Sequence, residues 1–280
     1  MHEGIGNEPC IARAGRFWQR RGMKPEFYAG NARYAAGLRE DPRRFQSLPA
    51  LCRGQSFYGK YVGALVEGTP SGGTILDVGC GAGQVVEALT ARGFAARGID
   101  VAPAEIQGCE RYDGRVIPHP DASLDSIGAF NVLEHVEEPV AFLDEMARVL
   151  KPGGQMVVSS PNFLRVLGWR DYHPHMAGIG QKIQNLRTLL EHIQLYGQER
   201  GMIHFEAMTP IYRDEPRPDD DATVATNALD LRHYFSVRGF SRIRVSCVDR
   251  PVPRLLEFLL DLTPLRYLML NAFVTARKAD

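Results

Sequence analysis

The sequence predicts an α/β fold with a doubly wound, mostly parallel sheet, and three observations lead to this prediction. Apolar runs typical of buried strands alternate with helical patterns between residues 73 and 160. A glycine-rich loop at residues 79–83 connects the first run to the first helix, and Asp100 ends the second run. Strands and helices that alternate at this spacing are typical of a parallel sheet covered by helices on both faces.

The first elements of this pattern lie between residues 58 and 101. Residues 58–66 have the apolar spacing of a short amphipathic helix. Residues 73–79 form an apolar run that ends in glycine, so we expect a buried strand there. A helix is predicted over residues 82–92, and residues 94–101 predict the second strand.

The later elements continue the alternation. A helix is expected to begin at Pro139, because proline at the first helical position sacrifices no hydrogen bond. The α/β pattern returns at residues 229–237, after the irregular segment. The apolar runs that predict the remaining strands are residues 126–132, 155–160, 242–249 and 272–278.

Two parts of the chain depart from this alternation. Residues 1–56 are polar and rich in arginine, so we expect an N-terminal lead-in or cap before a main domain over residues 57–280. Residues 161–225 are rich in Pro, His, Asp and Arg, with one predicted helix over residues 183–195. An irregular segment of this length inside a compact domain is usually a binding element, so we expect an inserted lid.

The composition of the 280 residues narrows the classes of function. Lys and Arg number 33, as do Asp and Glu, so no basic excess neutralises a phosphate backbone and we expect no nucleic-acid partner. Charged residues and a proline interrupt the longest apolar region, residues 255–270, so we expect no membrane span. The five cysteines form no CxxC pair, and no apolar signal segment follows Met1. We therefore expect reduced thiols and a cytoplasmic location.

The glycine loop and the acids around it discriminate between cofactors. Glycines let the backbone approach a ligand closely, and an acid after the second strand accepts hydrogen bonds from both hydroxyls of a ribose. A dinucleotide-binding loop reads G-x-G-x-x-G, whereas here the third glycine, Gly83, comes one residue early. Asp77 would repel a pyrophosphate but suits a ligand with an ammonium group. An NAD-dependent oxidoreductase is therefore retained only as an alternative.

The motifs around this loop resemble those of the class I S-adenosylmethionine-dependent methyltransferases. Five stretches are similar to motifs of that family and follow in the same order: ILDVGCGAGQ (75–84), GID (98–100), IPHPDASLD (117–125), FNVLEHV (130–136) and RVLKPGG (148–154). The resemblance covers residues 57–162 and the C-terminal strands. It implies a Rossmann-like methyltransferase fold whose last strand is antiparallel, with S-adenosylmethionine as the cofactor.

The resemblance also implies which residues contact this cofactor. Asp77 is expected near its amine, Asp100 on its ribose and Val101 beside its adenine. Only 12 residues separate Asp100 from Asp113, which leaves open whether Asp113 contacts the adenine or is a loop acid. The full set that the resemblance implies is Asp77, Gly79, Cys80, Gly81, Gly83, Asp100, Val101, Asp113 and Asn131.

A histidine is the candidate for proton removal. Methyl transfer to an oxygen atom requires removal of the acceptor's proton, which a base with a near-neutral pKa does best. Glu134 and His135 follow the predicted fourth strand, at the edge where doubly wound sheets bind ligands. We therefore predict His135 as the general base, with Glu134 beside it, and a packing histidine is the competing interpretation.

A metal site is another interpretation of these residues. Ubiquinone-pathway O-methyltransferases carry a similar E-x-x-E-H stretch that is proposed to bind a divalent cation. Asn131 stands here in place of the first glutamate, and an amide oxygen ligates a hard cation weakly. We therefore expect no metal at this site.

The predicted lid supplies candidates for acceptor binding. It contains several histidines, which we interpret as part of a polar acceptor-binding loop, with a metal cluster as the alternative. The three aspartates at residues 219–221 are expected to form a solvated face. The residues expected to line the acceptor pocket follow the predicted fifth strand, and ordinary packing is the alternative for each: Asn162, Phe163, Arg165 and Tyr172.

The Leu-rich segment over residues 251–271 is expected to contain a helix packed on the core. A homodimer contact or a groove for an apolar acceptor is the alternative. Taken with the motifs, the sequence predicts S-adenosylmethionine-dependent methylation of a small-molecule acceptor on oxygen. Nitrogen or carbon acceptors, and a non-catalytic binding protein of the same fold, remain alternatives because a fold does not prove an activity.

Overall fold

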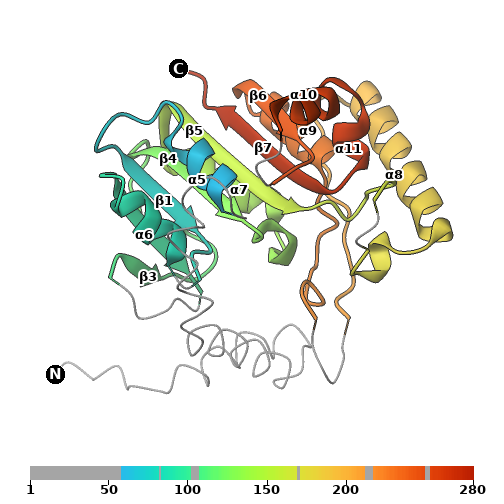
Figure 1. Cartoon of the computed structure of the whole chain (residues 1–280), viewed down its shortest axis with the longest axis horizontal. Coiled ribbons are helices and arrows are strands. Elements are labelled where there is room, and N and C mark those ends of the chain that lie inside the picture. The colour runs from blue at the N-terminus through green and yellow to red at the C-terminus, as the bar shows by residue number, and fades with distance from the viewer. Residues whose placement is uncertain (1–57, 82, 102–106, 169–170, 212–216, 250–252) are drawn as a thin grey trace.

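A seven-stranded sheet forms the centre of the computed structural model, which describes residues 58–280 apart from residues 82, 102–106, 169–170, 212–216 and 250–252 (Figure 1). The strand order is β3-β2-β1-β4-β5-β7-β6. The lead-in expected over residues 1–56 lies outside the described residues. The strands are β1 (Thr74–Val78), β2 (Ala95–Asp100), β3 (Cys109–Arg111), β4 (Leu124–Phe130), β5 (Leu150–Pro161), β6 (Ser241–Ser246) and β7 (Asn271–Arg277).

The directions of the strands confirm the predicted fold. Strands β1 to β5 pair in parallel, and β7 is antiparallel to both of its neighbours, β5 and β6. Asp77 of β1 lies opposite Gly98 of β2 and Gly128 of β4. The carboxyl ends of β1, β2 and β4 therefore meet at one edge of the sheet, where ligands of doubly wound folds bind.

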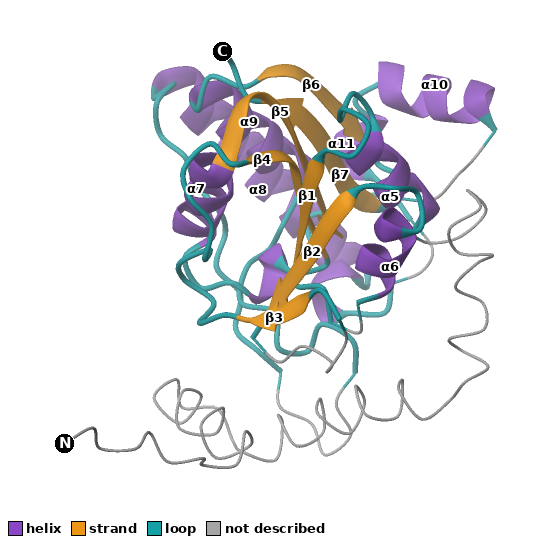
Figure 2. Ribbon diagram, turned by 90° about the vertical axis from the view of Figure 1, so that its left-hand side faces the viewer, coloured by secondary structure: helices purple, strands orange, loops and turns teal. Residues whose placement is uncertain are grey.

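Helices cover both faces of the sheet (Figure 2). Helices α5 and α6 pack on one face, and α7 and α9 pack on the other. Successive residues of a strand point to opposite faces, so Ile75 joins the first core and Leu76 the second. The helices are α5 (Gly59–Val66), α6 (Gln84–Thr90), α7 (Pro139–Val149), α8 (Ile179–Gln198), α9 (Ala228–Val237), α10 (Arg254–Leu262) and α11 (Leu265–Leu268), with short 3-10 turns at Leu133–His135 and Pro174–Met176.

Helix α7 shows how the sequence forms these elements. Pro139 occupies the first turn, as predicted. Four apolar side chains, Phe142, Leu143, Met146 and Val149, are buried at helical spacing against the sheet. Leu150 takes an extended conformation, so β5 begins directly after the helix and several residues before the predicted strand.

The segment predicted as a lid contains its own hydrophobic cluster. Helix α8 stands at the edge of the molecule next to α9 (Figure 1), and it extends the predicted helix at both ends. Residues from the beginning and the end of the segment meet in the cluster, so the segment folds back on itself. The buried residues that form the cluster are Phe163, Leu164, Met176, Leu189, Met208, Ala222 and Ala225.

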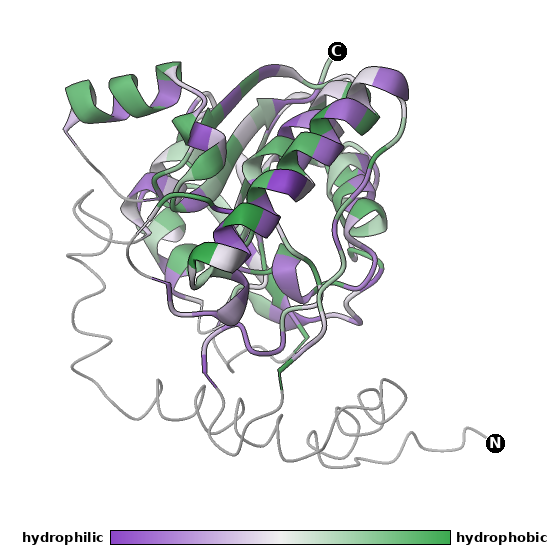
Figure 3. Ribbon diagram, turned by 90° about the vertical axis from the view of Figure 1, so that its right-hand side faces the viewer, coloured by the Kyte–Doolittle hydropathy of each residue, from purple (hydrophilic) through white to green (hydrophobic). Residues whose placement is uncertain are grey.

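The expectation that the Leu-rich helix packs on the core is wrong. Helix α10 projects from the body of the molecule and is largely apolar (Figure 3). The exposed fractions of Leu255, Phe258 and Leu262 are 71%, 58% and 64%. An ion pair between Lys60 Nζ and Glu257 Oε1 (2.5 Å) ties the helix to α5. Neither α10 nor any other described helix combines the length and the apolarity that crossing a membrane requires.

Candidate active site

The loop between β1 and α6 depends on its glycines. Gly79 has a φ of +76°, and a Cβ there would collide with Val132 Cγ2. Its N–H donates to the carbonyl oxygen of Ile99 at 2.7 Å, so the loop turns tightly over the end of β2. Gly81 has a φ of +49°, and a Cβ there would meet no described atom within 4 Å. Gly83 precedes α6 with a φ of +75°. The loop therefore leaves open space beside Gly81.

Asp77 is a buried acid at the end of β1. Its Oδ1 accepts a hydrogen bond from Tyr61 Oη at 2.8 Å. Tyr61 reaches it from α5 because Gly128 leaves room, and a Cβ at Gly128 would collide with the tyrosine Oη. Burial raises the pKa of Asp77 to about 7, while the Tyr61 hydrogen bond opposes this shift and Asp100 adds to it. A cation placed beside Asp77 would favour its charged form.

Asp100 ends β2 and contacts the glycine loop. Its Oδ2 accepts a hydrogen bond from the Gly81 N–H at 2.9 Å. The next side chain, Val101, is 42% exposed. The turn at Gly114 lies against it, since a Cβ at that glycine would be 3.2 Å from Val101 Cγ1. The structure thus brings together the acid predicted for a ribose and the apolar residue predicted beside an adenine.

Asp113 lies in the turn that adjoins Val101. Its exposed carboxylate accepts hydrogen bonds from the N–H groups of Arg115 and Val116 at 2.8 and 2.9 Å. The bonds from Val116 and then Arg115 lower the pKa of Asp113. The turn is therefore near the expected adenine position, but the carboxylate stabilises the turn itself.

Cys80 and Asn131 are the remaining members of the predicted cofactor set. A Cβ at Gly98 would lie 2.5 Å from Cys80 Cβ, so the absence of a side chain there lets Cys80 pack against β2. Burial raises the pKa of the Cys80 thiol, which makes it a packing group rather than a reactive one. Cys80, Cys109 and Cys247 are free thiols in the described part of the chain. Asn131 follows β4 as an exposed residue with a φ of +54°.

His135 is surrounded by carboxylates. Its Nδ1 lies 3.1 Å from Asp221 Oδ1, and its Nε2 lies 3.8 Å from Asp219 Oδ1 and 3.9 Å from Glu134 Oε1. The turn that carries His135 adjoins the glycine loop through Val132, whose carbonyl oxygen accepts the His135 N–H at 3.0 Å. The surrounding chain encloses the ring, but 31% of the side-chain surface stays exposed. His135 therefore has the largest exposed fraction of these four side chains.

Glu134 is fully buried behind His135. Its Oε2 accepts a hydrogen bond from Ser160 Oγ at 3.1 Å, whereas its Oε1 has no hydrogen-bond donor among the described residues. Its carbonyl oxygen accepts the N–H of Thr223 at 2.8 Å. This backbone bond fixes the end of the lid against the turn and brings residues 219–221 to the histidine.

These carboxylates determine the protonation of His135. Burial alone would lower the pKa of His135, but its pairing with Asp221, Glu134 and Asp219 outweighs burial and raises the pKa to about 10. Burial also raises the pKa of Glu134 to about 7 and holds that of Asp219 above its ordinary value. His135 therefore carries its proton at neutral pH in this arrangement. The pKa of His135 therefore lies above the near-neutral value that suits a general base, because Asp219 and Asp221 approach it from a distant part of the chain.

The aspartates at residues 219–221 do not form the predicted solvated face. Asp220 is 1% exposed, and the side chains of Asp219 and Asp221 are 14% and 21% exposed. Tyr172 Oη donates to Asp219 Oδ2 at 2.5 Å and links the other end of the lid to the same group. Three consecutive aspartates are also typical of a solvated surface. The local sequence therefore does not predict that these side chains contact His135 and Tyr172.

Three of the four predicted acceptor-binding residues are packed inside the lid. Asn162 is fully buried, and its Nδ2 donates to a carbonyl oxygen before β7 at 2.9 Å. Phe163 belongs to the hydrophobic cluster of the lid. Arg165 is buried and forms a 2.7 Å ion pair with Asp171. The expectation that these three line a pocket is corrected, because the chain after β5 folds under the lid. Tyr172, at 45% exposure, lies beside the His135 group.

The same group also has the composition of a cation site. Glu134, His135 and Asp219 each offer one ligand atom, and these atoms lie within 4.8 Å of one another. Two carboxylate oxygens and one imidazole nitrogen suit a divalent ion. Glu134 Oε1, which lacks a hydrogen-bond donor, would gain a partner from such an ion.

A groove of about 920 Å³ lies at the opposite end of the sheet. Its walls include Thr74, Ala95 and Leu124, at the beginnings of β1, β2 and β4. Among the described residues that line it, none belongs to the predicted site. Because doubly wound sheets bind ligands beyond the carboxyl ends of their strands, we assign the candidate site to the edge with Asp77, Asp100 and His135.

Comparisons with known proteins identify the family of this chain. A family model described as a methyltransferase domain matches residues 53–203. A ubiquinone biosynthesis O-methyltransferase of Xylella fastidiosa is 39% identical over 106 residues, which are 33% of this chain and 43% of the relative. An uncharacterized methyltransferase of a Mycobacterium species is 37% identical over 114 residues, 38% of this chain and 45% of the relative. The chain thus spans less than half the length of these curated relatives.

Two solved structures are also similar to this chain. One is a SAM-dependent methyltransferase from Archaeoglobus fulgidus, with 16% identity, a TM-score of 0.47, and coverage of 79% of this chain and 91% of that chain. The other is an S-adenosylmethionine-dependent methyltransferase from Mesorhizobium loti, with 16% identity, a TM-score of 0.47, and coverage of 77% and 96%. Both cover most of this chain but share few identical residues with it.

Proposed function

This chain belongs to the methyltransferase domain family, and from this premise we propose that it is an S-adenosylmethionine-dependent enzyme that methylates an oxygen atom of a small molecule. The observation that carries the proposal is a half-buried histidine beside the glycine loop, with one buried and two half-buried carboxylates around it. His135 offers a ring to the acceptor, and Glu134 and Asp219 lie within 4 Å of its Nε2.

The residues present fit the proposed cofactor. Asp77 offers a buried carboxylate that an ammonium group would stabilise. The Asp100 carboxylate, which accepts a hydrogen bond from Gly81, can accept those of a ribose instead. When bound, S-adenosylmethionine supplies a methyl group already activated on a sulfonium sulfur. The protein's own residues then have to position the acceptor and accept its proton.

His135 is the residue proposed to accept the hydroxyl proton. A pKa of about 10 leaves a small neutral fraction at pH 7, and this fraction grows tenfold per pH unit until the pKa is reached. We propose that Tyr172, whose hydroxyl binds Asp219, contacts the acceptor at the same point. Relatives named as ubiquinone biosynthesis O-methyltransferases support oxygen as the methylated atom.

A divalent cation is a second candidate arrangement for the same residues. The ligand atoms of Glu134, His135 and Asp219 converge without an ion, and Glu134 Oε1 lacks a hydrogen-bond donor in the described structure. A bound cation would orient a deprotonated acceptor oxygen by direct ligation. His135 would then be a ligand and not a base, and chelation would abolish turnover.

The test incubates the purified chain with methyl-labelled S-adenosylmethionine and a metabolite extract, and then identifies the labelled bond. We expect a labelled methyl ether or ester. His135→Asn is expected to lower kcat by about 10²–10⁴-fold with an unchanged affinity for S-adenosylhomocysteine. Glu138→Gln, an exposed neighbour, is the matched control. Label on nitrogen or carbon would reject oxygen methylation, and normal turnover of His135→Asn would reject the proposed base.

The lid is proposed to close over the acceptor. Tyr172 and residues 219–221, from its two ends, both contact the His135 group. Protease cleavage within residues 161–225 should slow when S-adenosylhomocysteine and acceptor are bound together. Equal cleavage rates with and without ligands would identify the segment as a fixed elaboration.

The apolar face of α10 is proposed as a homodimer contact. Leu255 and Phe258 are 71% and 58% exposed, and apolar patches of this kind mark interaction sites. Light scattering on Phe258→Glu should show a loss of dimer, whereas a monomeric wild type would reject the contact. We further propose that the enzyme works in the cytoplasm on a free small molecule, without a nucleic-acid partner, as its zero net charge supports.

A further inference from the structure

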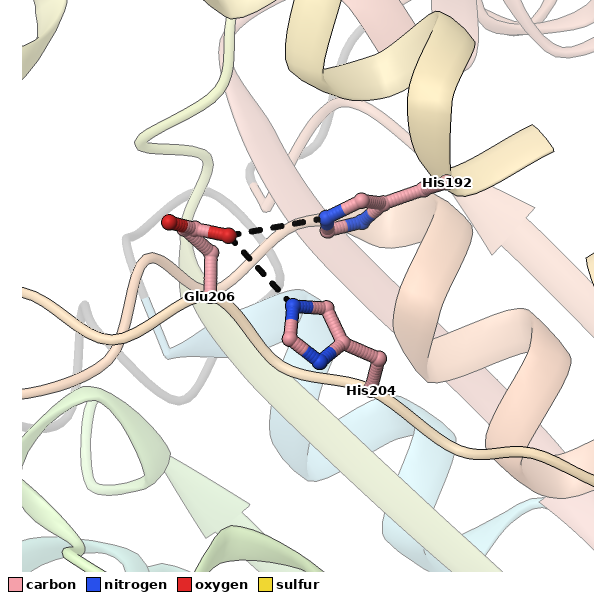
Figure 4. A group of neighbouring side chains, drawn as sticks. All are labelled: His192, His204 and Glu206. Atoms are coloured by element: carbon pink, nitrogen blue, oxygen red, sulfur yellow. Dashed lines mark hydrogen bonds and ion pairs between the residues drawn. The ribbon is translucent and has the colours of Figure 1, made fainter. Parts of the chain in front are cut away.

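A second group of histidine and carboxylate side chains lies in the lid, apart from His135. It consists of His192 on α8 and of His204 and Glu206 on the segment after this helix (Figure 4). His204 Nε2 lies 3.4 Å and His192 Nε2 lies 3.8 Å from the same carboxylate oxygen, Glu206 Oε2. All three potential ligand atoms lie within 4.8 Å of one another. Three separate side chains therefore converge on one point.

Two of the three separations between ligand atoms are close to those of a tetrahedral metal site, and the third is at most 4.8 Å. Zinc–nitrogen and zinc–oxygen bonds of about 2.0–2.1 Å at the tetrahedral angle place two ligand atoms about 3.3 Å apart. The His204–Glu206 distance of 3.4 Å already meets this value, and the His192–Glu206 distance of 3.8 Å exceeds it slightly. The two imidazole rings meet edge to face at 86°, so both rings can direct a nitrogen to the carboxylate without stacking.

His192 is held from behind in the way that metal-binding histidines are held. Its Nδ1 lies 2.8 Å from Oδ1 of Asp230, which is 0% exposed. Tyr196 Oη and Asn227 Nδ2 donate to the carboxylate of Asp230 at 2.7 and 2.6 Å. His192 can donate its Nδ1–H to Asp230, which leaves Nε2, 3.8 Å from Glu206 Oε2, as the nitrogen that would bind an ion. Metal-ligating histidines almost always donate their second N–H to a carboxylate or a carbonyl in this way.

We propose that His192, His204 and Glu206 bind a zinc ion, with the fourth position open to water. Two imidazole nitrogens and one carboxylate oxygen form a typical zinc ligand set, whereas calcium and magnesium prefer oxygen alone. The side chains of His204 and Glu206 are 44% and 46% exposed, while that of His192 is 5% exposed. The ion can therefore enter from solvent onto a buried, oriented histidine.

The zinc ion acts as a clamp within the lid. It would join α8 to the segment of residues 204–206, and Asp230 connects one of the ligands, His192, to α9. The carbonyl oxygen of Glu206 accepts the Ala225 N–H at 2.8 Å. Two residues earlier, the Thr223 N–H donates to the carbonyl oxygen of Glu134 at 2.8 Å. Binding of zinc thus stabilises the stretch of backbone that holds the end of the lid against Glu134.

The test measures zinc binding by the purified full chain after removal of metals with a chelator. Equilibrium dialysis and elemental analysis give the stoichiometry for the wild type, Glu206→Gln and His204→Asn. Glu199→Gln, an exposed glutamate at the end of α8, is the matched control. His135→Asn is included because Glu134, His135 and Asp219 form the other candidate group. Cobalt replaces zinc in a parallel series, because its visible spectrum reports tetrahedral coordination.

The expected result is one zinc ion that is lost in Glu206→Gln and His204→Asn and retained in Glu199→Gln and His135→Asn. Zinc at about 100 times its Kd should raise the Tm of the wild type by roughly 5–10 °C, and it should not raise that of Glu206→Gln. Melting curves without zinc show whether each variant is folded. No zinc uptake by the wild type, or equal uptake by the wild type and both ligand variants, would overturn the proposal. None of these measurements depends on methyl transfer, so a failed activity assay leaves the result intact.

Discussion

Proton release on cofactor binding is the most direct test of the role proposed for Asp77. Burial raises the pKa of this carboxyl group from its ordinary value of 3.8 to about 7. In the ligand-free protein it is therefore mostly protonated at pH 6. The proposed cofactor brings an ammonium group to it, and an adjacent cation favours the carboxylate. Cofactor binding below pH 7 must then release a proton from Asp77.

The size of the effect follows from the two pKa values. If the ammonium group restores an ordinary pKa, the shift is about 3 units, or about 4 kcal/mol as an upper limit. The pKa of Asp77 is lower in the complex than in the free protein, so the affinity for the cofactor is weakest at pH 4 and below. It rises by up to tenfold per pH unit between pH 4 and pH 7 and levels off above pH 7. Asp77 should release about 0.9 proton on binding at pH 6 and only about 0.1 at pH 8, where the α-amino group of the ligand takes up about half a proton instead. The α-amino group of the ligand, with a pKa of about 7.7–8.0, lowers affinity at still higher pH.

The assay is titration calorimetry with S-adenosylhomocysteine in two buffers that differ in ionisation enthalpy. The difference between the observed enthalpies gives the number of protons released at each pH. Asp77→Asn should remove the release at pH 6 and flatten the pH dependence of Kd. Tyr61→Phe removes the hydrogen bond that lowers the pKa of Asp77, so its midpoint should move to higher pH.

A second acid with a similar pKa serves as the control. Burial also raises the pKa of Glu134 to about 7, but this residue is not proposed to contact the cofactor. Glu134→Gln should therefore retain the proton release. The reasoning about Asp77 is refuted if Kd is independent of pH, or if Asp77→Asn releases the same number of protons as the wild type.

Four further predictions concern single residues. Asp100→Ala should weaken S-adenosylhomocysteine binding by about 2–4 kcal/mol in calorimetry, since it removes two charge-assisted hydrogen bonds to the ribose, and an unchanged Kd would count against the assignment. Gly79→Ala should lower the free energy of unfolding by about 2–4 kcal/mol in denaturant titration, because its Cβ collides at a φ of +76°. Gly81→Ala, at a φ of +49° with open space around it, should cost only about 1 kcal/mol. Asp221→Asn should lower the raised pKa of His135 and move the ascending limb of the pH–rate profile to lower pH, and an unmoved limb would exclude His135 as the titrating base.

The elements that the sequence predicts well are those fixed by local pattern. The glycine loop, the acid after β2 and the helix that begins at Pro139 each depend on residues that are neighbours in the chain. Their stereochemical reasons, such as the positive φ of Gly79, act over a few residues. The parallel order of strands follows from their alternation with helices, because a parallel pair needs a crossover connection.

The features that the sequence did not reveal depend on contacts between distant segments. Asp219 and Asp221 reach His135 because the Thr223 N–H binds the carbonyl oxygen of Glu134, 89 positions away in the chain. Their effect on the pKa of His135 is therefore a property of the folded lid. Burial of Phe163 follows from the same folding back, although its position after β5 indicated a pocket.

Helix α10 illustrates a different limit of sequence patterns. Its leucines have the spacing of an amphipathic helix, and this spacing is the same whether the partner is the protein's own core or another molecule. In the folded structure Leu255 and Leu262 are 71% and 64% exposed, which shows that α10 does not pack on the protein's own core. The sequence pattern alone does not contain this information.

The two histidine groups are connected through the backbone in a way that would let the lid influence His135, the proposed base. Thr223 and Ala225 are two residues apart, and their N–H groups bind Glu134 and Glu206 respectively. A shift of this short stretch would change the distance of Asp221 from His135 Nδ1, which is 3.1 Å in the described structure. Since Asp221 is the strongest of the groups that raise the pKa of His135, a small displacement there changes the fraction of neutral imidazole. The pH–rate profile therefore reports how firmly the lid is held as well as the chemistry of the histidine.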